Sequence, residues 1–163
     1  MKNTGKPFEK TIETILMQYA SKGILRMKKV DPPTRLLKLG GSTKVIMLPN
    51  PFLDYVGSWT ARHGRAVFME AKSTSEPQLK INSDGGLTVK QFEAMRQWQA
   101  AGAVTFVLWE HHGHVRMLTY DMVKAALETA KHIKFPCAIP VPNGLGFVIY
   151  NFVEIMEKIW PAK

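Results

Sequence analysis

Three charged side chains in the middle of the chain have the types and the spacing of a hydrolytic site. Glu70 and Lys72 stand two residues apart, directly after the apolar run 66–69. On a β-strand, residues i and i+2 project from the same face, so these two side chains are expected to point at one spot. Asp54 borders an earlier short apolar segment, and a hairpin between the two segments would bring its carboxylate beside them.

Two carboxylates and an ammonium at one point can hold a divalent cation and direct a water molecule. Mg²⁺ and Mn²⁺ prefer hard oxygen ligands, commonly one or two carboxylates with water and phosphate oxygens. Asp54 and Glu70 supply the carboxylates, and the carbonyl of Ala71 is a further candidate ligand. Lys72 is placed to orient the water, to assist its deprotonation or to offset charge on a phosphate. The alternative is a solvated Glu–Lys pair on an exposed strand, which the apolar run before it disfavours.

Hydrophobic periodicity and turn residues indicate the elements that must position this cluster. We expect helices over 7–22, 89–101, 120–131 and 151–160, and strands over 24–30, 53–57, 66–72, 104–109 and 114–118. The basic segment at about 31–50 is expected to form a hairpin or a protruding arm, residues 74–87 a loop, and residues 136–144 an irregular segment. This order predicts one domain over 1–163, of α/β class, with a central mixed β-sheet flanked by α-helices.

The net charge of +9 is unevenly distributed along the chain. Ten of the 22 Lys and Arg residues, but only three of the 13 Asp and Glu residues, lie in residues 1–50. A basic half beside a nearly neutral half indicates a surface for a polyanion such as nucleic acid; the alternative is a merely soluble basic protein. Because Cys137 is the single cysteine and no long apolar run or signal region exists, we expect a cytoplasmic protein without a membrane partner.

Four motifs, in this order, resemble the PD-(D/E)xK nuclease superfamily, and more narrowly the RecU-type and related phage or archaeal Holliday junction resolvases. They are Gly5-Lys6-Pro7-Phe8-Glu9, Asp54-Tyr55-Val56-Gly57, Phe68-Met69-Glu70-Ala71-Lys72-Ser73, and Val89-Lys90-Gln91-Phe92 followed by the segment 102–107. The resemblance spans residues 5 to about 120. Leu53 stands where the superfamily commonly has a proline before the aspartate, and we identify no counterpart for the residues from 132 onward.

The resemblance implies a restriction-endonuclease-like fold and a Mg²⁺- or Mn²⁺-dependent endonuclease that resolves four-way DNA junctions in a bacterial or phage-infected cell, leaving 5′-phosphate and 3′-hydroxyl ends. It makes Glu9, Asp54, Glu70 and Lys72 the catalytic set, with Gln91 auxiliary, and Asp54, Glu70, Ala71 and Glu9 the metal ligands. A homodimer is expected because two symmetric nicks need two active sites in a fixed relation. Its candidate interfaces are the first helix and the apolar edge near 66–69.

Two of these residues have structural alternatives. Glu9 borders the apolar stripe of its helix more closely than Glu13 does, but an acid in the first turn is also favoured by the helix dipole. Gln91 stands three residues after Thr88, which is the spacing of a capping box. Gln91 is therefore expected either to cap its helix or to contact the site.

Phosphate contacts are expected from nine basic residues: Lys6, Arg26, Lys28, Lys29, Arg35, Lys38, Lys44, Arg62 and Arg65. Such contacts position a protein on DNA without reading its sequence, although part of this set is expected to be an ordinary solvated face. The arm occupies the place of the projecting stalk of RecU-type proteins, which enters the junction centre. The resemblance therefore implies an insertion role for this shorter arm.

The remaining polar and aromatic residues are assigned mainly to structure. His111, His112 and His114 lack the spacing of a zinc site and are expected near a strand-to-strand turn. The four tryptophans are expected in the core or in interfaces, with stacking on a base as an alternative for Trp59. Two rival functions stay open: a nuclease of the same superfamily that acts on other DNA substrates, and a basic nucleic-acid-binding module without catalysis.

Overall fold

The computed structural model describes residues 5–47, 53–83, 85–144 and 150–161. Its helices are α1 (Gly5–Ser21), α2 (Val89–Ala100), α3 (Tyr120–Thr129) and α4 (Phe152–Ile159), with short 3-10 helices at Thr60–Arg62 and Phe135–Cys137. Its strands are β1 (Arg26–Lys29), β2 (Thr34–Leu39), β3 (Ser42–Met47), β4 (Tyr55–Trp59), β5 (Arg65–Ser73), β6 (Gln78–Lys80), β7 (Val104–His111), β8 (His114–Thr119), β9 (His132–Lys134) and β10 (Ile139–Pro140).

Six strands form a mixed sheet in the order β1-β4-β5-β7-β8-β10. β5 and β7 run parallel and are connected through α2, whereas the other neighbours are antiparallel. β5 is central, and Val67, Phe68 and Met69 are all buried, as its apolar run predicts. Segment 66–69 is therefore not a sheet edge, and the expectation that it forms a dimer interface is wrong.

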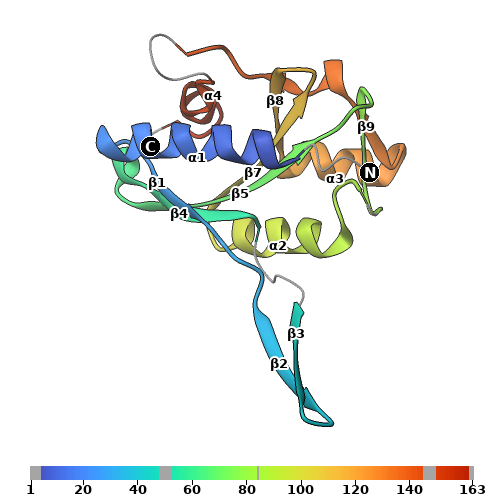
Figure 1. Cartoon of the computed structure of the whole chain (residues 1–163). Helices are drawn as coiled ribbons and strands as arrows, with labels where there is room; N and C mark the ends of the chain where they lie inside the picture. Colours follow the sequence, from blue (N-terminus) through green and yellow to red (C-terminus); the bar gives the residue numbers. More distant parts are fainter. Residues whose placement is uncertain (1–4, 48–52, 84, 145–149, 162–163) are drawn as a thin grey trace.

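The helices cover the two faces of the sheet in pairs, α1 with α4 on one face and α2 with α3 on the other (Figure 1). Side chains alternate between these faces along each strand. Tyr55 and Met69 pack into the core under α1, whereas Val56 and Phe68 pack against the core under α2. None of the described helices is long and apolar enough to cross a bilayer.

β2 and β3 form a separate hairpin, the arm, which projects from the body (Figure 1). Gly40 and Gly41 connect the strands with φ angles of 54° and 84°, a conformation that favours glycine and suits a two-residue hairpin turn. Leu36 and Val45 face each other across the arm and are 65% and 59% exposed. Neither core cluster contains a side chain of β2 or β3 among those that the structure describes, so the arm packs on its own.

Differences from the expected elements concern short segments and one helix start. β6 lies within the segment expected to be a loop and pairs with β9, and β10 lies within the segment expected to be irregular. α1 already includes Gly5 and Lys6, which precede the expected start at Pro7. Proline is tolerated there because the N–H groups of the first turn have no partner within the helix.

Candidate active site

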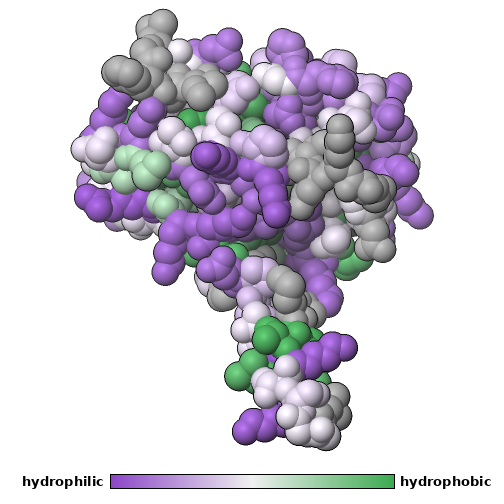
Figure 2. All heavy atoms as spheres, in the orientation of Figure 1, coloured by the Kyte–Doolittle hydropathy of each residue, from purple (hydrophilic) through white to green (hydrophobic). Residues whose placement is uncertain are grey.

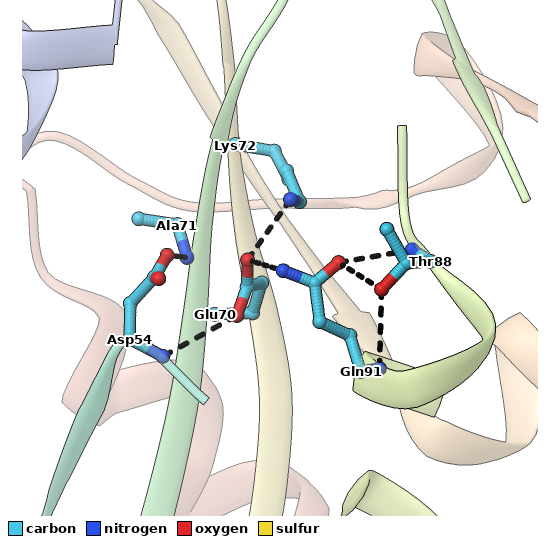
Figure 3. A network of polar contacts seen from close by, with 6 residues as sticks. All are labelled: Asp54, Glu70, Ala71, Lys72, Thr88 and Gln91. Carbon is cyan, nitrogen blue, oxygen red and sulfur yellow. Dashed lines mark hydrogen bonds and ion pairs between the residues drawn. The ribbon is translucent and has the colours of Figure 1, made fainter. Parts of the chain in front are cut away.

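The hairpin of β4 and β5 brings Asp54 to Glu70. The antiparallel ladder ends at the pair Tyr55–Met69, and Asp54 stands just beyond it. The Asp54 Oδ2 atom accepts a hydrogen bond from the Ala71 N–H at 3.1 Å, and the Asp54 N–H donates to Glu70 Oε2 at 3.3 Å (Figure 3). The structure thus places both expected carboxylates at one corner of the sheet.

Lys72 and Glu70 point together from the face of β5 that looks toward α2. The Lys72 Nζ atom lies 2.9 Å from Glu70 Oε1, as the spacing of two residues on a strand predicts. Glu70 is only 1% exposed, and this burial raises its pKa to about 8 against the opposing effect of Lys72. The nearby Asp54 carboxylate raises the pKa of Glu70 further. Such a pair favours a bound cation, because a positive charge stabilises both ionised carboxylates.

Gln91 caps its helix and contacts the site at the same time. Its side-chain Oε1 accepts hydrogen bonds from the Thr88 N–H at 2.9 Å and the Thr88 hydroxyl at 3.1 Å. The Thr88 hydroxyl in turn accepts from the Gln91 N–H, which completes the capping box. The Gln91 Nε2 atom donates to Glu70 Oε1 (Figure 3). The cap therefore fixes which end of the amide faces the carboxylate.

The backbone of Ala71 adds a carbonyl to the same corner. The N–H and C=O of one strand residue point toward the same neighbouring strand. Because the Ala71 N–H is bound to Asp54, its carbonyl faces the Asp54 side, beyond the end of the β4–β5 ladder. Two carboxylates and a carbonyl are hard oxygen donors of the kind that Mg²⁺ and Mn²⁺ prefer. The donor set therefore fits either ion.

Glu9 lies at the border of this corner and is held by an ion pair. Its Oε2 atom is 2.6 Å from Lys29 Nζ, and its side chain is 31% exposed. The bond to Glu9 raises the pKa of Lys29, and the charges of Glu13 and Asp54 raise it further, so Lys29 lies among these acids. Within the described residues, no three acidic, His or Cys side chains gather closely enough to hold a metal. A ligand role for Glu9 stays a prediction.

Tyr55 belongs to the surroundings of the site, although the sequence did not single it out. Its hydroxyl donates to the Glu9 carbonyl at 3.4 Å. Burial raises the pKa of Tyr55, and the charges of the surrounding carboxylates raise it further: Glu13, Glu9, Asp54 and Glu70. This tyrosine therefore lies in the negative field of all four acids. Its position in the sequence could have identified it, because Tyr55 directly follows Asp54 at the start of a strand.

The predicted phosphate contacts fall into four groups. Lys6 is exposed in α1, while Arg26, Lys28 and Lys29 are on β1 and Arg35, Lys38 and Lys44 on the arm. Hydrophilic side chains dominate the surface where the arm joins the body, and apolar ones are exposed further along the arm (Figure 2). Arg62 and Arg65 lie at the opposite end of the β4–β5 hairpin from Asp54. Arg65 donates to the Gly102 carbonyl at 3.0 Å, so it already has a structural partner.

Two aromatic assignments are decided by the fold. Trp59 is fully buried, so the alternative that it stacks on a base is wrong. His111 and His114 pair across the β7–β8 ladder, and His112 and Gly113 form its two-residue turn, as expected.

Comparisons with known proteins identify a family and solved structures of similar fold. The family model described as recombination protein U matches residues 3–138. A solved structure of Hjc from Archaeoglobus fulgidus, described as a Holliday junction resolvase from an archaeal hyperthermophile, is 16% identical with a TM-score of 0.50. The alignment covers 81% of this chain and 94% of that chain, and confirms the α/β restriction-endonuclease-like fold. A search of curated protein sequences finds no match.

Proposed function

The chain belongs to the recombination protein U family of Holliday junction resolvases, and we propose that it cuts four-way DNA junctions at the corner formed by Asp54 and Glu70. The observation that supports this site is the convergence of both carboxylates, the Lys72 ammonium and the Gln91 amide beside the basic strand β1. Clustered acids repel a DNA backbone unless a cation intervenes. This charge pattern is therefore better suited to hydrolysis than to binding alone.

We propose that Asp54, Glu70 and the Ala71 carbonyl hold a Mg²⁺ or Mn²⁺ ion, with Glu9 as a further ligand. When bound, the ion supplies the charge that lowers the pKa of a water and stabilises the leaving oxygen. Lys72 orients the attacking water or offsets charge on the phosphate. The Gln91 amide keeps Glu70 in place by donating from Nε2 to Glu70 Oε1. The products of this hydrolysis carry 5′-phosphate and 3′-hydroxyl ends.

Two larger features complete the proposal. Resolution requires two nicks, and a homodimer with two-fold symmetry supplies two sites in the geometry that a four-way junction presents. The arm carries Arg35, Lys38 and Lys44 together with the exposed pair Leu36 and Val45, and we propose that it enters the centre of the junction.

Cleavage of synthetic DNA with Asp54→Asn as the matched variant tests this function. The amide keeps the shape of the side chain but removes its charge. We expect junction cleavage in Mg²⁺ to fall at least about 100-fold, because cation binding supplies several kcal/mol of transition-state stabilisation. Junction binding in EDTA should be retained. Unchanged cleavage by Asp54→Asn would exclude this site, and equal rates on four-way, flap and linear DNA would exclude resolvase selectivity.

A further inference from the structure

A pocket of about 390 Å³ lies between β1 and α2, close to the root of the arm. Residues that line it include Lys28, Val56, Phe68 and Trp98, together with Lys29 and Asp31. Lys28 pairs with Val56, and Val56 pairs with Phe68, so the three residues form one row across three strands. Because directly paired residues share a face of the sheet, all three side chains point toward α2.

The pocket contains an aromatic platform. The Trp98 ring stacks on Phe68 with ring centroids 4.1 Å apart and an angle of 16° between the planes. Phe68 is buried, while Trp98 is half-buried and lines the pocket. Aromatic platforms beside cationic groups are the usual means by which proteins hold an unstacked nucleotide, with the base on the ring and the phosphate on the cation. The volume also lies in the range of pockets for small molecules.

The pocket adjoins the catalytic corner. Phe68 precedes Glu70 by two residues on the same face of β5, a distance of about 6.6 Å along the strand. On the β1 side, the Val30 N–H donates to the Asp54 carbonyl at 2.8 Å. A DNA strand with its scissile phosphate at Asp54 and Glu70 therefore has a neighbouring nucleotide within reach of Trp98.

We propose that this pocket holds one unstacked DNA base next to the branch point, with its ring against Trp98 and its phosphate at Lys28. Lys29 is engaged by Glu9, which leaves Lys28 as the lysine of the pocket for the phosphate, and the Asp31 carboxylate, which also lines the pocket, can accept hydrogen bonds from amino groups of the base. Unstacking is least costly where a base already lacks a regular neighbour, as at the point where strands exchange. The proposal rests on the proposed function, because it places the junction at this corner.

Binding of the full chain to four-way junctions in EDTA, measured by fluorescence anisotropy, tests the pocket without any cleavage. One junction is intact, and the other lacks the bases that flank the branch point. Trp98→Leu keeps apolar packing on Phe68 but removes the platform, so we expect about 5- to 100-fold weaker binding to the intact junction. On the abasic junction the same variant should match the wild type, and Trp98→Phe should restore binding to the intact junction.

Lys28→Ala tests the phosphate contact. It should weaken binding to both junctions alike and lower the slope of log K against log salt by about one. Lys124→Ala, which removes the same charge from an exposed position of α3, is the matched control and should change neither quantity.

Three results would overturn the proposal that this pocket holds a base. They are unchanged binding of the intact junction by Trp98→Leu, an equal loss on intact and abasic junctions, and a wild type that binds both junctions equally. An equal loss accompanied by a change in sedimentation would instead assign Trp98 to a contact between chains. If the wild type binds and resolves the intact junction in any of these cases, only the proposal of a base-binding pocket is wrong, and the proposed function stands. A wild type that neither binds nor cleaves the junction removes the proposed function itself.

Discussion

At the scale of single residues, Glu70 is a buried acid whose charge is only partly compensated. Oε1 contacts Lys72 and Gln91, and Oε2 accepts from the Asp54 N–H, yet burial still raises its pKa from 4.5 to about 8. When the pKa of an acid is higher in the folded state than in the unfolded state, folding is most favourable below the unfolded value. That contribution is lost as the pH rises through the folded value.

Glu70→Gln is therefore predicted to change how stability depends on pH in the metal-free protein. Relative to the wild type, the variant should gain about 3 kcal/mol in free energy of unfolding between pH 5 and pH 8, because glutamine has no charge to bury. Urea unfolding in EDTA at several pH values measures this difference. Addition of Mg²⁺ at pH 8 should stabilise the wild type and leave the variant unchanged, since a ligand stabilises only the folded state that binds it. Parallel stability curves in EDTA would contradict the burial argument.

Thr88 is predicted to matter for cleavage as well as for helix stability. Thr88→Val removes both hydroxyl contacts, which should lower the free energy of unfolding by about 1 kcal/mol and, because the Gln91 amide is no longer oriented, lower kcat by about 10- to 100-fold. Thr119 caps α3 through the Met122 N–H, so Thr119→Val is the matched control. Single-turnover cleavage and urea unfolding separate the two effects. Equal kcat losses in both variants would show that capping in general, and not the Gln91 contact, is responsible.

The sequence identified most of these residues by type and spacing. It did not predict that one side chain would serve both the helix cap and the site. The pairing of Glu70 with Lys72 follows from strand geometry alone, and the capping box of Gln91 follows from its spacing to Thr88. That one amide serves the cap and Glu70 together depends on where α2 packs against β5, which local pattern does not contain. The ion pair between Glu9 and Lys29 joins α1 to β1 and is likewise a tertiary contact.

At the scale of elements, the arm is independent of the core and should be removable. Replacing residues 35–46 with Asn-Gly joins Thr34 to Met47 through a two-residue turn that suits a hairpin. Because none of the described side chains of β2 and β3 lies in either core cluster, we expect the midpoint of thermal unfolding to change by only a few degrees. Binding to the four-way junction should weaken more than binding to linear duplex, since only the junction has an open centre.

Fluorescence anisotropy with both DNA substrates measures the change in binding, and calorimetry measures the midpoint of thermal unfolding. The double variant Leu36→Ser, Val45→Ser keeps the arm but removes its exposed apolar pair, and is the matched control. If removal of the arm weakens binding to junction and duplex by the same factor, the arm is a general phosphate contact and does not recognise the branch.

Long periodic elements were predictable, whereas the short strands were not. β5 carries a continuous apolar run, which identified it as a buried strand. β6 and β9 have three residues each, and their pairing joins segments about 50 residues apart, so no local periodicity reveals them. The central position of β5 also excludes segment 66–69 from a dimer interface. That position is set by the strand order of the sheet, which the hydrophobicity of the segment does not reveal.

At the scale of the whole molecule, both edges of the main sheet resist pairing with another chain. β10 has two residues and ends in Pro140, and β1 carries Arg26, Lys28 and Lys29 in a four-residue strand. Short strands, proline and charges at an edge disfavour edge-to-edge association. A symmetric dimer of this chain is therefore expected to use helical or loop surfaces, which leaves the basic edge strand available to DNA.

Dimeric cleavage predicts a specific result for mixtures of active and inactive chains. A plasmid with an extruded cruciform becomes linear when both symmetric nicks are made and becomes a nicked circle when one is made. With a tenfold excess of Asp54→Asn chains, most dimers that contain an active chain are mixed dimers with one complete site, so nicked circles should replace linear product. Gel analysis across mixing ratios measures the shift, with an excess of Lys124→Ala chains as the active control. A ratio of linear to nicked product that stays constant as inactive chains are added would contradict paired sites, because each chain would then act alone.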